Sequence, residues 1–136
     1  GIMATFGAAV TSPTYAADAL KAVDDIMKSA AAWSAELQHA NKPPLKAGAA
    51  VATGRIIFGA VGDKTRMEYT VIGDAVNLSA KLEKHTKSEG VRALCTAAAF
   101  DIAIRQGYQP PVKREQRKAR SIEGVEAAVD IVILAP

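Results

Sequence analysis

The chain has 136 residues and a mass of 14.2 kDa, which suits a single domain, and 49% of its residues are apolar. This composition excludes a disordered chain, and no apolar run reaches the roughly 20 residues of a membrane-spanning helix. Neither a membrane segment nor a secretion leader is therefore expected. The single cysteine, Cys95, cannot close an intrachain disulfide, which indicates a reducing, cytoplasmic setting.

The net charge of +3 arises from one segment, residues 113–120 (KREQRKAR), which holds five basic residues and one acidic residue. The rest of the chain carries 12 basic and 13 acidic residues, so it offers no basic surface for nucleic acid. The few aromatic residues do not interleave with this basic segment. We interpret the basic segment as the solvated edge of a hairpin, and binding to nucleic acid or an acidic partner is the alternative.

The first part of the chain predicts a strand followed by a long helix. Residues 1–7 (GIMATFG) are apolar and bounded by glycines, as in a buried strand. Ser12 and Pro13 then offer an N-cap and a first helical residue, and the amphipathic pattern continues to about residue 38. The expected buried stripe is Ala16, Leu20, Val23, Met27, Ala30 and Leu37, and the expected solvent-exposed side is Asp18, Lys21, Asp24, Asp25 and Lys28.

The middle of the chain predicts two strands, an extended segment and a second helix. Small residues, β-branched residues and glycines over 45–62 indicate two short strands joined near residue 54. Residues 69–72 are expected to be extended and to lead into a helix over about 75–87. Asp74 is the expected N-cap of this helix, and Gly90 its expected end.

The last third predicts alternating short elements. Residues 91–94 read as a strand, and Thr96 can cap a short helix that reaches about residue 105. Two prolines at 110–111 break the chain, and residues 129–134 form a final strand. The alternation of strands and helices predicts an α/β sandwich with helices packed on a sheet.

Three features of catalytic interest have simpler explanations. His39 and His85 stand apart without acidic or cysteine neighbours at ligand spacing, so we expect surface histidines and no zinc site. Cys95 lies in an apolar stretch and is expected to be a small core residue. Residues 62–65 (GDKT) look like the end of a phosphate-binding loop, but Asp63 separates the glycine from the lysine and would repel phosphate.

The helix after Asp74 presents a more informative set of side chains. Asn77 and Lys81 are four residues apart and share a face, separate from the apolar stripe that includes Leu78 and Leu82. Thr70 lies on the preceding extended segment. A hydroxyl, an amide and an ammonium on one strand–turn–helix suit a phosphorylated ligand with a polar ring. By residue type alone, solvated surface side chains are the alternative.

Residues 69–83 (YTVIGDAVNLSAKLE) closely resemble the signature of class III adenylate and guanylate cyclase catalytic domains. Residues 1–8, 48–62 and 122–124 agree with the family in order and spacing, so the resemblance covers nearly the whole chain. It implies an α/β (α+β) fold, the ferredoxin-like sandwich of the class III nucleotidyl cyclase type, lacking its first strand and helices. Residues 1–136 are then expected to be the C-terminal two thirds of one catalytic domain.

The resemblance also implies how such domains work. They act as head-to-tail homodimers with two nucleotide sites at the interface, and each site takes two metal-binding aspartates from one chain. The partner chain supplies the groups that read the base and hold ribose and phosphate. On this pattern Thr70 and Val71 are substrate-binding, with Thr70 at the base-reading position; Asn77 orients the ribose, and Lys81 stands where the family usually has arginine. Threonine at position 70 is similar to bacterial adenylate cyclases, so ATP is the expected substrate.

Departures from the family pattern leave a second hypothesis open. The ligands for Mg²⁺ or Mn²⁺ are expected upstream of Gly1, so residues 1–136 alone are expected to lack metal-dependent catalysis and contain no metal-binding residues. Glu123 stands where relatives often have lysine, and Lys81 cannot make the two-pronged contact of a guanidinium. The first hypothesis is part of an adenylate cyclase that converts ATP to 3′,5′-cyclic AMP and pyrophosphate in intracellular signalling. The alternative is a non-catalytic cyclase-like module that dimerises or senses nucleotide.

Overall fold

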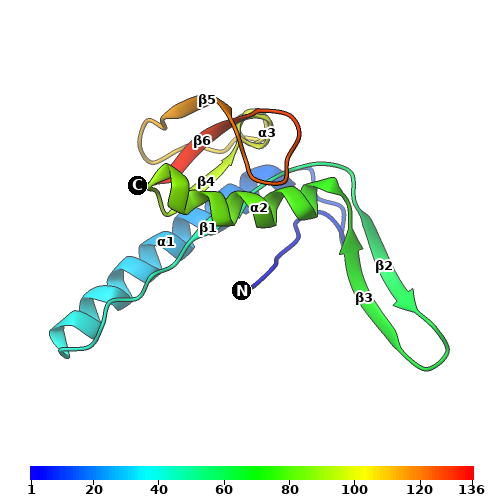
Figure 1. The fold of residues 1–136 in the computed structure, drawn as a ribbon, viewed down its shortest axis with the longest axis horizontal. Helices are drawn as coiled ribbons and strands as arrows, with labels where there is room; N and C mark the ends of the chain where they lie inside the picture. The colour runs from blue at the N-terminus through cyan, green and yellow to red at the C-terminus, as the bar shows by residue number, and fades with distance from the viewer.

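The computed structural model describes residues 1–136 and forms a sheet with helices on both faces and one projecting hairpin (Figure 1). The predicted α/β class is therefore confirmed. In chain order the elements are α1 (Tyr15–His39), β1 (Ala49–Val51), β2 (Ile57–Gly62), β3 (Met67–Ile72), α2 (Asp74–Glu89), β4 (Ala93–Thr96), α3 (Ala97–Arg105), β5 (Gln116–Arg120) and β6 (Val129–Ala135). No helix combines the length and the apolar character that crossing a membrane requires.

The main sheet has the strand order β1-β4-β6-β5. β1 pairs with β4 in parallel, and the other two pairs are antiparallel. A parallel pair needs a long crossover, and here the β2–β3 hairpin together with α2 provides it. The two short strands predicted within 45–62 are present as β1 and β2, but they belong to different sheets.

Residues of the central strands alternate between two apolar clusters, one on each face of the sheet. Ala93 and Cys95 of β4 pack with α1 and α3, whereas Leu94 packs with Leu82 of α2. β6 repeats the pattern, because Val132 and Leu134 join the first cluster and Ile131 and Ile133 the second. A strand buried on both faces reads as a continuous apolar run, which explains the sequence of residues 131–134.

The long helix α1 confirms the predicted stripe except at its end. Five of the six predicted residues are buried, and Leu37 is only half-buried because the C-terminal third of α1 extends past the sheet (Figure 1). The predicted cap is wrong, since the N-cap residue is Thr14 and not Ser12. The first turn is instead capped from a distant element: Gln106 Oε1 accepts from the backbone N–H groups of Ala16 and Ala17 at 2.8 and 3.1 Å.

The predicted strand over residues 1–7 is wrong. These residues have no strand partner in the structure, and the side chain of Ile2 is 99% exposed. An apolar run becomes a strand only where a neighbouring strand takes its backbone hydrogen bonds, and no strand of either sheet pairs with this segment.

Boundaries around α2 and β4 differ from expectation by small, explicable shifts. Gly73, not Asp74, is the N-cap residue of α2, and Asp74 begins the first turn, where a carboxylate interacts favourably with the helix dipole. Gly90 ends α2 as predicted, with φ 68° in the left-handed region. The strand expected at 91–94 lies at Ala93–Thr96, since Val91 and Arg92 form the turn after α2. Thr96 caps α3 as predicted, accepting from the N–H of Ala99 at 3.1 Å.

The basic segment 113–120 forms the edge strand β5, as predicted, but its arginines are not simply solvated. Arg117 and Arg120 both bind Glu89, with N···O distances of 2.8 and 2.7 Å. The side chain of Glu89 is only 1% exposed, and His85 Nε2 lies 2.8 Å from it, so the prediction of a surface His85 is wrong. These ion pairs neutralise part of the local positive charge.

A third arginine of the basic segment, Arg114, contacts both α1 and β6. Arg114 binds Asp24 of α1 at 2.7 Å, and Tyr108 donates to the same carboxylate at 2.5 Å. Asp24 was expected on the solvent-exposed side of α1, but it is half-buried in this cluster. The periodicity of one helix cannot reveal a charged partner 90 residues away.

We predict that Glu89→Gln destabilises the protein by about 3 kcal/mol at neutral pH, because two arginines lose their counter-charge. Burial alone would raise the pKa of Glu89, but its hydrogen bonds to Arg120, Arg117 and His85 outweigh this and lower that pKa to about 2. The wild type should keep this stabilisation above pH 4.5, the unperturbed pKa, and lose it as the pH falls from 4.5 to about 2.

Urea unfolding of both proteins at several pH values measures this difference. Glu36→Gln is the matched control, since Glu36 is exposed on α1 and forms no ion pair, and it should change stability at neutral pH by less than about 0.5 kcal/mol. A wild-type-minus-Glu89→Gln difference that stays constant down to pH 2 contradicts the prediction.

Candidate functional site

The candidate site is built on the strand–turn–helix formed by β3, Gly73 and α2. The turn is tight because Gly73 lies against the segment before β2: a Cβ at Gly73 would lie 2.8 Å from the carbonyl oxygen of Arg55. In the same segment before β2, a Cβ at Gly54 would lie 3.1 Å from the Cβ of Ala75. The approach at Gly73 requires glycine, the one at Gly54 leaves little room for a side chain, and both join the hairpin to the start of α2.

Thr70 and Val71 lie on opposite faces of the hairpin, as successive residues of a strand do. Thr70 is half-buried and pairs with Gly59 of β2, whose missing side chain leaves open space beside it. Val71 pairs with Phe58, on the face where the rings of Phe58 and Tyr69 stack at 6.2 Å. The two predicted substrate-binding side chains therefore project from opposite faces of the hairpin, and of the two only Thr70 is polar.

Asn77 and Lys81 lie one turn apart on α2, as the spacing predicts. Asn77 is exposed in the first part of the helix. Lys81 is half-buried, and its ammonium donates to the carbonyl oxygen of Gly124 in the β5–β6 connection. The structure thus brings Lys81 against the segment 122–124, which is 43 residues away in the chain.

Gly124 was not predicted to contact Lys81. Two features of this glycine show the contact. Gly124 has φ +76°, in the left-handed region, and a Cβ there would lie 3.2 Å from the Cε and Nζ atoms of Lys81. Ile122 is 2% exposed and anchors this segment in the cluster under α2. The exposed Glu123 lies between the anchor and the glycine, so a carboxylate is carried close to the helix that bears Lys81.

Other candidate groups have structural roles. Asp63 closes the β2–β3 turn by accepting from Thr65 Oγ1 and from the backbone N–H groups of Thr65 and Arg66, at 2.5, 2.7 and 3.0 Å. These hydrogen bonds lower the pKa of Asp63, and they agree with the rejection of a phosphate loop. Cys95 is a core residue as predicted: burial raises its pKa to about 12, so it supplies no thiolate nucleophile.

A divalent metal needs several oxygen, nitrogen or sulfur ligands in one place. The chain has no group of three or more histidine, cysteine, aspartate or glutamate side chains that could hold such an ion. Residues 1–136 therefore show no site for the metal ions that the resemblance implies.

Sequence comparison finds relatives along part of the chain. An uncharacterized protein of Mycobacterium tuberculosis is 46% identical over 61 residues, which are 45% of this chain and 11% of that protein. Adenylate cyclase 1 of Rhizobium meliloti is 27% identical over 97 residues, 71% of this chain and 15% of that protein. Adenylate cyclase of Anabaena cylindrica is 39% identical over 54 residues, 40% of this chain and 11% of that protein. The chain thus matches only a small part of each relative's length, and no family model matches it.

Solved structures agree over most of the chain. The guanylyl cyclase Cya2 superposes with a TM-score of 0.69 at 20% identity, over 94% of this chain and 61% of that chain. The guanylate cyclase domain of RhGC from Catenaria anguillulae superposes with a TM-score of 0.60 at 15% identity, over 96% of this chain and 65% of that chain. At these identities the likeness establishes the fold, which is that of class III nucleotidyl cyclase domains.

We predict that Gly124→Ala destabilises the protein by about 1–2 kcal/mol, since alanine resists the left-handed conformation and its Cβ displaces Lys81. Urea unfolding measures the change. Gly59→Ala is the matched control, because Gly59 has open space around it and no positive φ, and it should stay within about 0.5 kcal/mol of the wild type. Equal effects of the two substitutions contradict the assignment of Gly124.

Proposed function

We propose that this chain, which has the fold of class III nucleotidyl cyclase domains, is part of an adenylate cyclase that converts ATP to 3′,5′-cyclic AMP and pyrophosphate. The observation that carries the proposal is the placement of Thr70, Asn77 and Lys81 on one strand–turn–helix of that fold. Two of the relatives are named adenylate cyclase, which supports ATP over GTP. Residues 1–136 are then about two thirds of one catalytic domain, consistent with the 61% of Cya2 that the superposition covers.

In the proposed reaction, the ribose 3′-oxygen attacks the α-phosphorus and the bond to pyrophosphate breaks. Thr70 Oγ1 accepts from the exocyclic amine of adenine, in the open space beside Gly59. The Asn77 amide orients the ribose. Lys81 places a positive charge where negative charge develops on the phosphoryl oxygens, which lowers the barrier electrostatically. When bound, Mg²⁺ or Mn²⁺ would supply Lewis-acid stabilisation, and in this proposal residues outside 1–136 would hold the ion.

A homodimer belongs to the same proposal, and the β2–β3 hairpin supports it. The hairpin projects from the body of the domain (Figure 1), and a two-stranded sheet is at best marginally stable alone. Its large apolar side chains are strongly exposed: Ile57, Phe58, Val61, Met67, Tyr69 and Ile72. A second copy that covers this surface would stabilise the hairpin and place Thr70 close to an interface. A cytoplasmic location fits a chain whose single cysteine, Cys95, is buried.

The alternative, a non-catalytic module that dimerises or senses nucleotide, is favoured by one contact. The ammonium of Lys81 is bound to the Gly124 carbonyl and is not free toward the helix surface. An active enzyme must offer that charge to the triphosphate, so the contact has to break or rearrange when substrate binds.

The first test is a manganese–ATP cyclase assay on a version of the protein that carries the residues encoded upstream of Gly1. Residues 1–136 alone and a GTP reaction run beside it. Cyclic AMP formation by the longer protein, absent from residues 1–136 and exceeding cyclic GMP formation, is the expected result. If the longer protein is folded and dimeric but forms neither product, the proposal fails in favour of the non-catalytic module.

In the active longer protein, Lys81→Arg should raise the rate about threefold to tenfold, because a guanidinium makes a planar two-pronged contact with phosphoryl oxygens. The effect should be on kcat, measured with saturating manganese–ATP. Lys84→Arg is the matched control on the exposed side of α2 and should leave the rate unchanged. An unchanged or lower rate for Lys81→Arg counts against its assigned role.

A further inference from the structure

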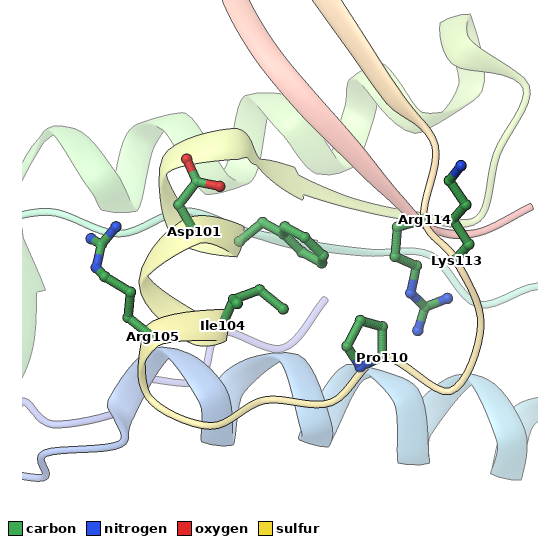
Figure 2. A pocket seen from close by; sticks show the side chains of 7 residues that line it. Asp101, Ile104, Arg105, Pro110, Lys113 and Arg114 are labelled. Atoms are coloured by element: carbon green, nitrogen blue, oxygen red, sulfur yellow. The ribbon is translucent and has the colours of Figure 1, made fainter.

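A pocket lies between α3 and the connection from α3 to β5 (Figure 2). The pocket is a shallow, open hollow with a volume of about 610 Å³. The lining combines an apolar part, Phe100, Ile104 and Pro110, with the charged residues Asp101, Arg105, Lys113 and Arg114. None of these residues belongs to the proposed nucleotide site.

The apolar part of this α3 pocket is incompletely covered. Ile104 is 42% exposed although it lies in a hollow, and Phe100 is only half-buried. The ring of Phe100 contacts Tyr108 edge-on, with ring centres 6.2 Å apart, so its position is held by the core behind it. A ligand with an apolar body would remove this surface from water.

The charges around the pocket favour an anion. Three of the lining residues are basic and one is acidic. Arg105 and Lys113 form no ion pair, and Figure 2 shows them on opposite sides of the pocket, one on α3 and one on the connection. Even with Arg114 neutralised by Asp24, the lining keeps a net positive charge against the single carboxylate of Asp101.

Arg114, which also lines the pocket, has one nitrogen without a hydrogen-bond acceptor. Its side chain is only 8% exposed, and its other guanidinium nitrogens bind Asp24, Tyr108 and the Leu134 carbonyl. Its Nε is buried with no hydrogen-bond partner. Buried donors are rarely left unpaired, and this one belongs to a residue that lines the pocket.

The pocket is also preformed, because the connection that makes one wall is attached to α1 at two points. Gln106 binds the backbone of the first turn of α1, and Tyr108 and Arg114 bind Asp24. A ligand therefore does not have to order this wall, which reduces the entropic cost of binding.

We propose that the α3 pocket binds a small amphipathic carboxylate. The apolar body lies on Phe100, Ile104 and Pro110, and the carboxylate lies toward Lys113 and Arg114 on the connection. This site is independent of the proposed cyclase activity and does not require it.

The test is a titration of ¹⁵N-labelled residues 1–136 with sodium octanoate, followed by ¹H–¹⁵N correlation spectra. Saturable shifts confined to residues 100–114 and the adjoining first turns of α1 are expected. Acetate, which lacks the apolar body, and octylamine, which reverses the charge, should each bind about tenfold more weakly than octanoate. Octylamine that binds as well as octanoate, or shifts spread over the surface, overturns the proposal.

Two charge-matched double variants locate the site. Arg105→Gln with Lys113→Gln should weaken octanoate binding about fivefold or more, since the unpaired positive charges are removed. Lys84→Gln with Lys118→Gln removes the same charge from exposed positions outside the pocket and should leave the affinity unchanged. All four side chains are exposed, so the spectra should report a retained fold. Equal affinities of the two double variants would also overturn the proposal.

Discussion

The pairing of β4 with β6 at the centre of the main sheet is the constraint on which the rest of the structure depends. Both strands are buried on both faces, so each alternate residue must meet a different helical layer. One face requires α1 and α3, and the other requires α2. Because β1 and β4 are parallel, the chain between them must cross over the sheet. The hairpin, the close turn at Gly73 and α2 make up this crossover.

The geometry of the crossover explains why the candidate site lies where it does. Thr70 is on the second strand of a hairpin that leaves the body of the domain, and Asn77 and Lys81 are on the helix that returns to it. One part of the site is thus carried by an exposed element and the other by a packed one. A nucleotide site divided in this way is suited to completion by a second copy, as the proposed dimeric cyclase requires.

Buried charge networks organise the other end of the domain. Glu89 holds the edge strand β5 through Arg117 and Arg120, and Asp24 holds the connection before β5 through Arg114. The arginines of the basic segment therefore link α1 and α2 to the sheet through ion pairs. Removing one partner from such a pair is costly, because the remaining charge is left in a poorly solvated place.

Local patterns were enough to identify most elements. The apolar stripe of α1, the glycine at the end of α2, the capping threonine of α3 and the apolar run of β6 depend on neighbouring residues, and each is confirmed. The position of Asn77 and Lys81 on one face is equally local, because helical spacing determines it. The signature around residues 69–83 also led directly to the fold, which the solved cyclase structures confirm.

Contacts between distant residues could not be read in this way. The sequence alone predicted a strand at residues 1–7, a surface His85 and a solvated Asp24, and all three are wrong. Only the tertiary structure placed Lys81 on Gly124 and Gln106 at the start of α1. The physical reason is that periodicity reports which side of an element is apolar. A strand, an ion pair or a long-range cap exists only when another part of the chain supplies its partner.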